Sequence, residues 1–261
     1  MKVAILYICT GKYTQFFKGF YESAEKYFLH GIADKEYFVF TDDMNLSSEK
    51  NVHLNYKKYE GFPLDSLFKF DMFLRVESEI SQFDYVYFFN SNAEFRVPVG
   101  EEILPDESGL AMGIWPGRDK QLPIFYPYER NKKSLAYVKP FGKNYIYYMG
   151  GLNGGTAQEY LQLIKTLSKN IRDDYNRGII ARVHDESHIN AYMRHHSCKI
   201  IGHGYCWPEE WPCDFSPKIV LRDKAKAFPD CVDFTKGRDH SLWGKVKNAL
   251  GIAKRAIMWY I

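Results

Sequence analysis

The sequence predicts an α/β domain built on a mainly parallel β-sheet. Short apolar runs rich in aromatic and β-branched residues end at polar residues or glycine, as buried strands do. Segments with apolar residues at helical spacing lie between these runs. The length of 261 residues allows one large domain with a sizeable core. Alternating strands and helices favour a parallel sheet, whose ligands gather at the carboxyl ends of the strands.

The elements of the first half follow from these patterns. Residues 2–10 form a buried first strand, and residues 13–29 form a helix with aromatic side chains on one face. Residues 36–41 form a second strand that stops at two aspartates. A helix over about 64–82 leads into a third strand at 84–89.

The second half begins with a segment rich in glycine, proline and tyrosine over residues 97–145, which we expect to form loops that line a site. Thr156 and Glu159 have the form of a capping box and open a helix that should end by Gly178. A further helix starts within 183–188. We expect a catalytic domain over 1–222 and a basic segment over 223–261.

Composition excludes several classes of protein. A net charge of +3 is too small to indicate a nucleic-acid partner. Five widely spaced cysteines (Cys9, Cys198, Cys206, Cys213 and Cys231) are read as free thiols in a reducing compartment. No export signal and no window of about 20 apolar residues is visible, which predicts a cytoplasmic protein without a membrane-spanning helix.

The third strand ends in Asn90-Ser91-Asn92, which is the most informative feature of the chain. Side chains two residues apart on a strand point to the same side. In many nucleotide-sugar glycosyltransferases an Asp-x-Asp at such a place holds a divalent metal against the donor diphosphate. The neutral amides of Asn90 and Asn92 give a hard cation little reason to bind. A simple turn after a strand is the alternative reading.

Two histidine groups suggest zinc but do not fit it. His184 and His188 are four residues apart, yet Glu186 follows the first histidine by two positions, where the zinc-protease motif has one. His195, His196, Cys198, His203 and Cys206 lack the paired spacing of a structural zinc site. We therefore expect no metal and no other cofactor.

Several motifs together resemble the retaining α-1,3-galactosyl- and N-acetylgalactosaminyltransferases that include the ABO blood-group enzymes. The matching pieces, in chain order, are the residues 22–28, 37–42, 90–96, 128–130, 147–151, 154–155 and 184–190. The most specific are Tyr147-Tyr148-Met149-Gly150-Gly151 and His184-Asp185-Glu186-Ser187-His188. The resemblance covers residues 3–222. It implies a glycosyltransferase-A type fold, with a central mostly parallel sheet and flanking helices.

The resemblance also implies roles on the donor side. Glu186 matches the catalytic glutamate, as a covalent nucleophile or as a stabiliser of the oxocarbenium-like transition state, and the sequence leaves both open. Asp185 would contact hydroxyl groups of the donor sugar, or cap its helix, or do both. Ile8, Thr10 and Tyr13 would border the uracil, and a core position is their alternative.

The departures from the animal enzymes concern the metal and the acceptor. Asn90 and Asn92 stand where those enzymes have aspartates and need manganese, and bacterial relatives share the asparagines. The charge of the missing metal would come from Lys224, Lys226 or Arg222 closing over the diphosphate. The acceptor side would include Trp115, Val183 and Trp207, and all three regions depart from the animal pattern. The acceptor expected from the resemblance is an α-1,2-fucosylated β-galactoside.

The triplet Met149-Gly150-Gly151 bears on the donor sugar. In the family, glycine at the last position leaves room for an N-acetyl group, whereas Met149 accompanies the galactose-using form. Gly151 therefore favours UDP-GalNAc over UDP-Gal. The function predicted is metal-free, retaining transfer of GalNAc or Gal to O3 of the acceptor. The alternative is an inactive protein that binds sugar nucleotides or glycans, which Glu186 argues against.

The last 21 residues, 241–261, lie outside the resemblance and predict an amphipathic helix. Its apolar face would hold Leu242, Val246, Leu250, Ala253, Ile257 and Ile261. Basic residues lie largely elsewhere and aromatic residues lie near its ends, as in helices that rest on anionic membranes. The helix would then place the protein at the inner face of the membrane. The alternative is a helix that packs on the protein's own surface.

Overall fold

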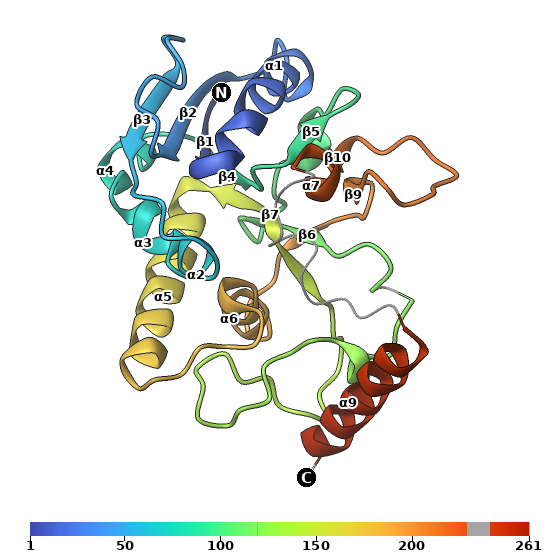
Figure 1. Cartoon of the computed structure of the whole chain (residues 1–261). Coiled ribbons are helices and arrows are strands. Elements are labelled where there is room, and N and C mark those ends of the chain that lie inside the picture. Colours follow the sequence, from blue (N-terminus) through green and yellow to red (C-terminus); the bar gives the residue numbers. More distant parts are fainter. Residues whose placement is uncertain (119, 229–240, 261) are drawn as a thin grey trace.

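The computed structural model describes residues 1–118, 120–228 and 241–260 (Figure 1). Its centre is a seven-stranded sheet in the order β3-β2-β1-β4-β7-β6-β8. Only β7 runs antiparallel to its neighbours β4 and β6, so the described sheet is mostly parallel, as predicted. Its strands are β1 (Lys2–Ile8), β2 (Asp34–Thr41), β3 (Val52–Tyr56), β4 (Tyr85–Phe89), β6 (Leu110–Ile114), β7 (Tyr148–Thr156) and β8 (Lys199–Ile201). This architecture is that of a glycosyltransferase-A-like fold.

Helices cover both faces of the sheet because its strands are apolar on both sides. Along β1, Ala4 and Leu6 face one core, whereas Val3, Ile5 and Tyr7 face the other. The first core is covered by α3, α5 and α6, and the second by α1 and the small sheet. The helices are α1 (Phe17–Tyr27), α2 (Leu64–Leu67), α3 (Lys69–Leu74), α4 (Glu77–Ile80), α5 (Ala157–Asn176), α6 (His184–Tyr192), α7 (Lys224–Ala227) and α9 (Leu242–Tyr260), with 3-10 turns η1 (Gly11–Phe16), η2 (Glu101–Ile103) and η3 (Pro123–Phe125).

A second sheet of three strands, in the order β5-β10-β9, lies beside the main one (Figure 1). Its strands are β5 (Ala93–Phe95), β9 (Tyr205–Pro208) and β10 (Ile219–Leu221). Because β5 starts directly after Asn92, this sheet connects the end of β4 to the segment that precedes α7.

Three predicted elements differ from the structure. The helix predicted over 64–82 is three short helices, α2, α3 and α4, and the chain turns at Phe68 and Val76. The helix predicted from residue 13 begins as the 3-10 turn η1 and becomes α-helical only at Phe17. The segment 97–145, predicted as loops, contains the buried strand β6.

The helix predicted at the carboxyl end is present as α9 and lies against the loops of residues 123–147 (Figure 1). Among its described side chains, those of Ala256 and Trp259 are buried, and the Trp259 indole N–H donates to the Val138 carbonyl oxygen at 2.7 Å. The predicted apolar face points the other way, with Val246, Leu250, Ala253 and Ile257 all exposed. The Leu242 side chain and Ile261 lie outside the described part of this helix.

Candidate functional site

The site lies where the chain leaves the carboxyl ends of β1 and β4 and enters β7. Because β7 is antiparallel to β4, its first residues extend past the end of β4. The Asn90 backbone N–H donates to the Gly151 carbonyl oxygen at 2.8 Å, which joins the Asn-Ser-Asn turn to the glycine pair. The topology therefore brings together the two motifs that the sequence singled out.

The amino-terminal turn of α6 supplies the two carboxylates. His184, its first residue, has a positive φ of 47°, which is uncommon for a residue with a side chain. The His184 ring meets the Phe62 ring edge-on, with centroids 4.7 Å apart. Asp185 and Glu186 follow and are both buried, although carboxylates are seldom found inside proteins. Such burial needs specific partners for each carboxylate.

Glu186 has three hydrogen-bond donors around its carboxylate. The Tyr147 hydroxyl donates to Oε1 at 2.6 Å. The Gly150 N–H and the Trp115 indole N–H donate to Oε2 at 2.6 and 2.9 Å. Burial raises the pKa of Glu186 above its ordinary value, and these three hydrogen bonds lower it in part. The donors fix the orientation of the carboxylate, as a nucleophile or a charge stabiliser requires.

Asp185 forms a buried ion pair with a lysine that the sequence did not single out. Lys69 Nζ lies 2.6 Å from Asp185 Oδ2 and donates to the Gly150 carbonyl oxygen at 2.7 Å. The Ser66 hydroxyl donates to Asp185 Oδ1 at 2.6 Å. Lys69 is 3% exposed, so the pair has almost no contact with solvent. Asp185 is therefore held from α2 and α3 rather than acting as a helix cap.

β7 and α6 approach each other closely at Gly150. A methyl group added there would lie 2.9 Å from Asp185 Oδ2 and 3.3 Å from Glu186 Cβ. Lys69 and Ser66 hold Asp185 in place, so its carboxylate cannot easily give way. At Gly151 an added methyl group would meet Asn90 Cβ at 3.3 Å. Both glycines therefore allow the neighbouring residues to approach the strand closely, and Met149 beside them is fully buried.

The two asparagines bind each other and the chain. Asn90 Nδ2 donates to Asn92 Oδ1 at 2.8 Å, and Asn92 Nδ2 donates to the Arg222 carbonyl oxygen at 2.6 Å. The Arg222 N–H donates back to the Asn92 carbonyl oxygen at 2.8 Å. These amide oxygens carry no charge to offer a hard cation, and Asn92 Oδ1 already accepts a hydrogen bond from Asn90. Within the described ranges, no three His, Cys, Asp or Glu side chains gather as metal ligands.

The expected nucleotide side gathers around Tyr13. Ile8 ends β1, and the buried Thr10 hydroxyl donates to Asp65 Oδ2 at 3.1 Å. Lys224 Nζ lies 5.0 Å from the centre of the Tyr13 ring, and burial lowers the pKa of Lys224 to about 8. The contacts of Lys224 and Phe228 with the Tyr13 ring hold α7 beside η1.

The other two candidate cations, Lys226 and Arg222, do not have their charged groups at the Tyr13 ring in the described contacts. Lys226 is exposed on α7. Arg222 Nε forms an ion pair with Glu94 Oε2 at 3.3 Å, and its guanidinium lies over the Phe16 ring. The Lys224 side chain therefore lies beside a predicted donor residue, Tyr13, whereas Arg222 is joined to Asn92 through its backbone.

The expected acceptor residues divide into two groups. Trp115 joins the site through its hydrogen bond to Glu186, and Val183 is half-buried immediately before α6. Trp207 lies in β9, where its indole N–H donates to the Trp211 carbonyl oxygen at 3.1 Å. Its ring packs against those of His203, Trp211 and Phe215. The described contacts therefore link Trp207 to its own loop and not to Glu186.

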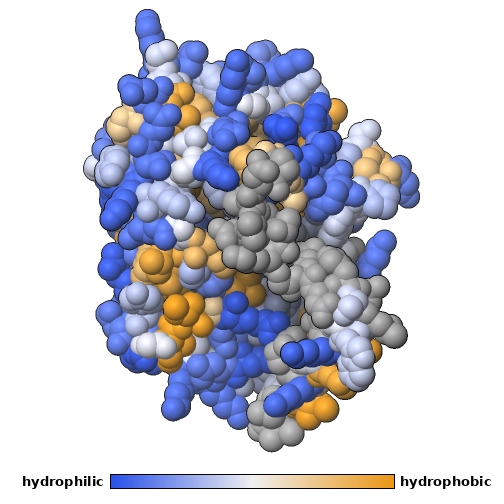
Figure 2. Space-filling model, viewed as in Figure 1, coloured by the Kyte–Doolittle hydropathy of each residue, from blue (hydrophilic) through white to orange (hydrophobic). Residues whose placement is uncertain are grey.

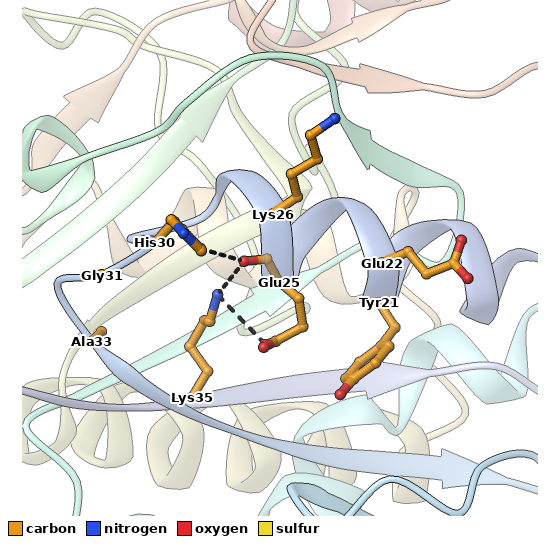
Figure 3. A pocket seen from close by; sticks show the side chains of 8 residues that line it. All are labelled: Tyr21, Glu22, Glu25, Lys26, His30, Gly31, Ala33 and Lys35. Carbon is orange, nitrogen blue, oxygen red and sulfur yellow. Dashed lines mark hydrogen bonds and ion pairs between the residues drawn. The ribbon is translucent and has the colours of Figure 1, made fainter.

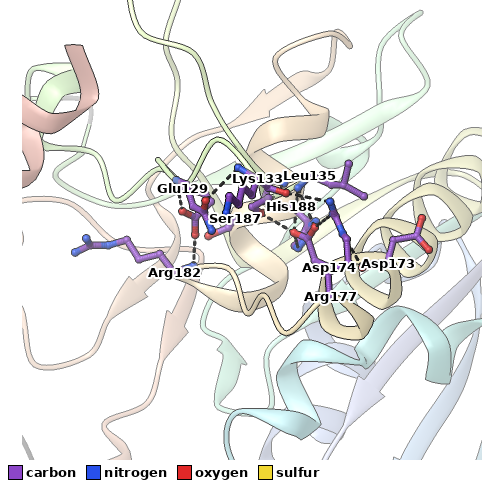
Figure 4. A network of polar contacts seen from close by, with 12 residues as sticks. Glu129, Lys133, Leu135, Asp173, Asp174, Arg177, Arg182, Ser187 and His188 are labelled. Carbon is purple, nitrogen blue, oxygen red and sulfur yellow. Dashed lines mark hydrogen bonds and ion pairs between the residues drawn. The ribbon is translucent and has the colours of Figure 1, made fainter. Parts of the chain in front are cut away.

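A buried polar network joins α6 and the segment before it to the end of α5 and to residues 129–135 (Figure 4). Asp174 at the end of α5 accepts from the Ser134 hydroxyl at 2.6 Å and pairs with Arg177. Its Oδ2 lies 3.7 Å from His188 Nε2, and burial lowers the pKa of His188. Glu129 Oε2 accepts from the Arg182 N–H at 2.6 Å. His188 is thus a buried histidine that packs α6 against the end of α5.

An open depression of about 630 Å³ lies between α1 and β2, away from these motifs. Figure 3 shows Lys35 and His30 directed at the end of α1. Lys35 Nζ donates to the carbonyl oxygens of Ala24 and Phe28 at 3.0 and 2.9 Å, so this buried lysine caps the helix. The depression is a feature of helix packing.

The described cysteines form no disulfide. Cys9, Cys198, Cys206 and Cys213 are free thiols, as predicted, and Cys231 lies outside the described residues. A search of the described residues finds no helix with the length and apolar character needed to span a bilayer.

Comparison with known proteins agrees with the site. The family model described as Glycosyltransferase family 6 matches residues 1–224. The chain is 35% identical to the O-antigen biosynthesis glycosyltransferase WbnI of Escherichia coli over 87% of this chain and 96% of that protein. It is 32% identical to the rat histo-blood group ABO system transferase 1 over 77% of this chain and 60% of that protein. It is 27% identical to the chicken globoside alpha-1,3-N-acetylgalactosaminyltransferase 1 over 85% and 65%.

Proposed function

Because the chain belongs to glycosyltransferase family 6, we propose that it transfers GalNAc or Gal from a UDP-sugar, with retention, to O3 of a β-galactoside. The family implies a UDP-sugar donor and a glycan acceptor. The observation that best supports the proposal is the carboxylate of Glu186, buried and held by three donors beside the Asp185–Lys69 pair. An inactive binder would have no need for a carboxylate oriented in this way.

The proposed mechanism divides the work between the two acidic residues. Glu186 would face the anomeric carbon and stabilise or capture the positive charge that develops there. Asp185, fixed by Lys69 and Ser66, would position the donor sugar through its hydroxyl groups. The hydroxyl of the acceptor would approach past Trp115, whose indole N–H already contacts Glu186.

Transfer should not require a divalent metal. The side chains of Asn90 and Asn92 are neutral and form hydrogen bonds with each other and with the Arg222 backbone. The leaving diphosphate needs positive charge, and Lys224 beside Tyr13 is in a place to provide it. Lys226 follows it on α7. The proposal therefore expects α7 to contact the diphosphate.

The donor is proposed to be UDP-GalNAc rather than UDP-Gal. Gly151 leaves open the space beside Asn90 that a side chain would occupy. Met149 is buried with its sulfur beside Gly113, and its methyl group lies 3.7 Å from the position of an added methyl group at Gly151, so Met149 borders that space. The acceptor is proposed to carry an α-1,2-linked fucose on its galactose, on the strength of the likeness to the ABO transferases alone.

We also propose that the protein attaches to an anionic membrane, at its cytoplasmic face, through α9. Lys247 and Lys254 are exposed, and at about 100° per residue both lie along the same edge of the exposed apolar face of Val246, Leu250 and Ile257. Lysines at that place can reach lipid phosphates while the apolar side chains enter the interface. Trp259 faces the protein at the same time, so one helix can both dock and bind lipid.

The donor and the metal are tested in one assay. Transfer to lactose and to 2′-fucosyllactose is followed with UDP-GalNAc and with UDP-Gal, in EDTA and again with added manganese. The proposal expects turnover in EDTA, a higher kcat/KM for UDP-GalNAc, and preference for the fucosylated acceptor. Loss of turnover in EDTA with recovery in manganese would contradict the metal-free mechanism.

A further inference from the structure

The Trp259 side chain of α9 is buried, although α9 lies beyond the residues that the family model matches. Apolar and hydrophilic residues lie side by side over α9 in Figure 2, at the lower right. Trp259 is 2% exposed, whereas Trp243 in the same helix is 82% exposed. The Trp259 indole N–H donates to the Val138 carbonyl oxygen at 2.7 Å, and the Arg130 guanidinium carbon lies 5.0 Å from the centre of its ring. The end of α9 is therefore built into the core of the protein.

A series of ring contacts leads from Trp259 to the reaction centre. The centres of the Trp259 and Tyr128 rings are 6.0 Å apart, and those of the Tyr128 and Tyr147 rings are 5.6 Å apart. Tyr126 packs against both tyrosine rings, with centres 5.5 and 5.8 Å away. With Val138 these residues form one buried cluster. Because protein interiors are close-packed, one ring of the cluster cannot move without its neighbours.

Tyr147 connects this cluster to the carboxylate that the proposed function uses. Its hydroxyl donates to Glu186 Oε1 at 2.6 Å, whereas the other two described donors both reach Oε2. The Tyr128 hydroxyl donates to the Ile146 carbonyl oxygen at 2.7 Å, which fixes the backbone directly before Tyr147. A tyrosine hydroxyl follows every tilt of its ring. The packing around the Tyr147 ring therefore decides whether Glu186 receives this hydrogen bond.

We infer that Trp259 is a positioning residue for Glu186. Its ring, acting through Tyr128, holds Tyr147 in the orientation from which the hydroxyl fixes the carboxylate. The inference rests on the proposed function, because it gives α9 a part in arranging that site. Replacing Trp259 with alanine would leave a space beside Tyr128, and the neighbouring rings would relax into it. Glu186 would then lose a charge-assisted hydrogen bond, while the distant nucleotide side of the site keeps its contacts.

A double-mutant cycle in transfer from UDP-GalNAc to 2′-fucosyllactose tests this coupling. It compares the wild type, Trp259→Ala, Tyr147→Phe and the double variant, each shown to be folded by circular dichroism. We expect each single variant to lose about 10- to 100-fold in kcat, as for a lost hydrogen bond to a charged group, with unchanged affinity for UDP. In the Tyr147→Phe protein, Trp259→Ala should cause little further loss, because the hydroxyl through which it acts is already absent.

Three other variants at tryptophan positions of α9 complete the cycle. Trp243→Ala makes the same change at an exposed position of α9 and should match the wild type. Trp259→Phe keeps a ring against Tyr128 and should restore most of the lost kcat. Trp259→Leu fills more of the space than alanine, and it takes the place of Trp259→Ala in every measurement if the alanine variant does not fold.

The pKa of Glu186 provides a readout that needs no sugar transfer. Burial raises this pKa, and the hydrogen bond from Tyr147 lowers it in part. The carboxylate band of Glu186 is followed by infrared spectroscopy during a pH titration, with Glu186→Gln as the blank. We expect a higher pKa of Glu186 in Trp259→Ala than in the wild type, and the wild-type pKa in Trp243→Ala.

These substitutions at Trp259 and Trp243 add and remove no charge near the carboxylate. Asp185, whose charge also raises the pKa of Glu186, keeps its partner Lys69, and Arg118 beside the Tyr147 ring is retained. A change in the pKa of Glu186 therefore reports the hydrogen bond from Tyr147.

Three results would overturn the inference. They are wild-type kcat in either single variant, full additivity of Trp259→Ala and Tyr147→Phe in kcat, and the wild-type pKa of Glu186 in Trp259→Ala. If the wild type transfers no sugar from any UDP-sugar, the proposed function fails, and the pKa of Glu186 in Trp259→Ala then decides whether Trp259 positions this carboxylate.

Discussion

Replacing Lys69 should destabilise the protein strongly, because it breaks a buried ion pair. Lys69 and Asp185 are 3% and 5% exposed, and Nζ lies 2.6 Å from Oδ2. Removing the lysine leaves a buried carboxylate with the Ser66 hydroxyl. It also takes one donor from the Gly150 carbonyl oxygen, which still accepts from Asn153 Nδ2 at 3.1 Å. Breaking such a pair from one side costs about 3–5 kcal/mol. We therefore expect Lys69→Met to lower the free energy of unfolding by about that amount.

Urea unfolding at neutral pH measures the loss, with thermal unfolding as a second readout. At about 2–4 °C for each kcal/mol, the midpoint should fall by roughly 6–20 °C. The double variant Lys69→Met, Asp185→Asn removes both charges and should recover roughly 1–3 kcal/mol relative to the sum of the single variants. Lys169→Met is a matched control, because its pair with Asp173 is largely exposed and should cost under about 1 kcal/mol. A loss as small as that of the control would refute the argument that the pair holds Asp185.

Three further predictions concern the same site. Gly150→Ala should lower turnover in a transfer assay by about 100-fold, because its methyl group would displace Asp185 and Glu186. Gly202→Ala is the control and should match the wild type, because no atom lies within 4 Å of the added carbon. At pH values above the ordinary pKa of a glutamate, Glu186→Gln should have a higher free energy of unfolding than the wild type. Burial raises the pKa of Glu186 in the folded state, so the wild type loses stability as pH rises from the ordinary pKa to the raised one. The loss persists at higher pH. Thermal melts from pH 4 upward measure this, and parallel curves for the two proteins would contradict it. Binding of UDP should weaken as pH rises through about 8, because Lys224 must be protonated to pair with the diphosphate. This pH dependence should be absent in Lys224→Met. Equal affinities of the wild type for UDP at pH 7 and pH 9, measured by calorimetric titration, would contradict the prediction.

The sequence predicted the parts of the site that have a local signal. Asn90 and Asn92 end an apolar run, and the His-Asp-Glu motif has a recognisable order, so their place at the edge of a parallel sheet followed from the pattern. Glu186 and Trp115 were each expected at the site, but their hydrogen bond depends on strand β6, which the sequence did not show.

Lys69 was missed because a charged residue in a helical pattern is usually exposed. The residues around it, Leu67, Phe70 and Phe73, are all buried, and that surrounding was the available signal. Strand β7 was missed because glycine weakens a strand pattern, and its several glycines instead allow close approach of other residues. The two faces of α9 were not separable by periodicity, since Trp259 packs inward while the predicted apolar face stays exposed.

The claim that Glu186 is the catalytic carboxylate is tested most directly by transfer from UDP-GalNAc to 2′-fucosyllactose with EDTA present. The wild type and Glu186→Gln are compared at equal concentration, after circular dichroism shows that both are folded. The account predicts an α-linked product from the wild type and a loss of at least about 100-fold in kcat for Glu186→Gln, with UDP binding retained. Turnover by Glu186→Gln within a few-fold of the wild type would contradict it.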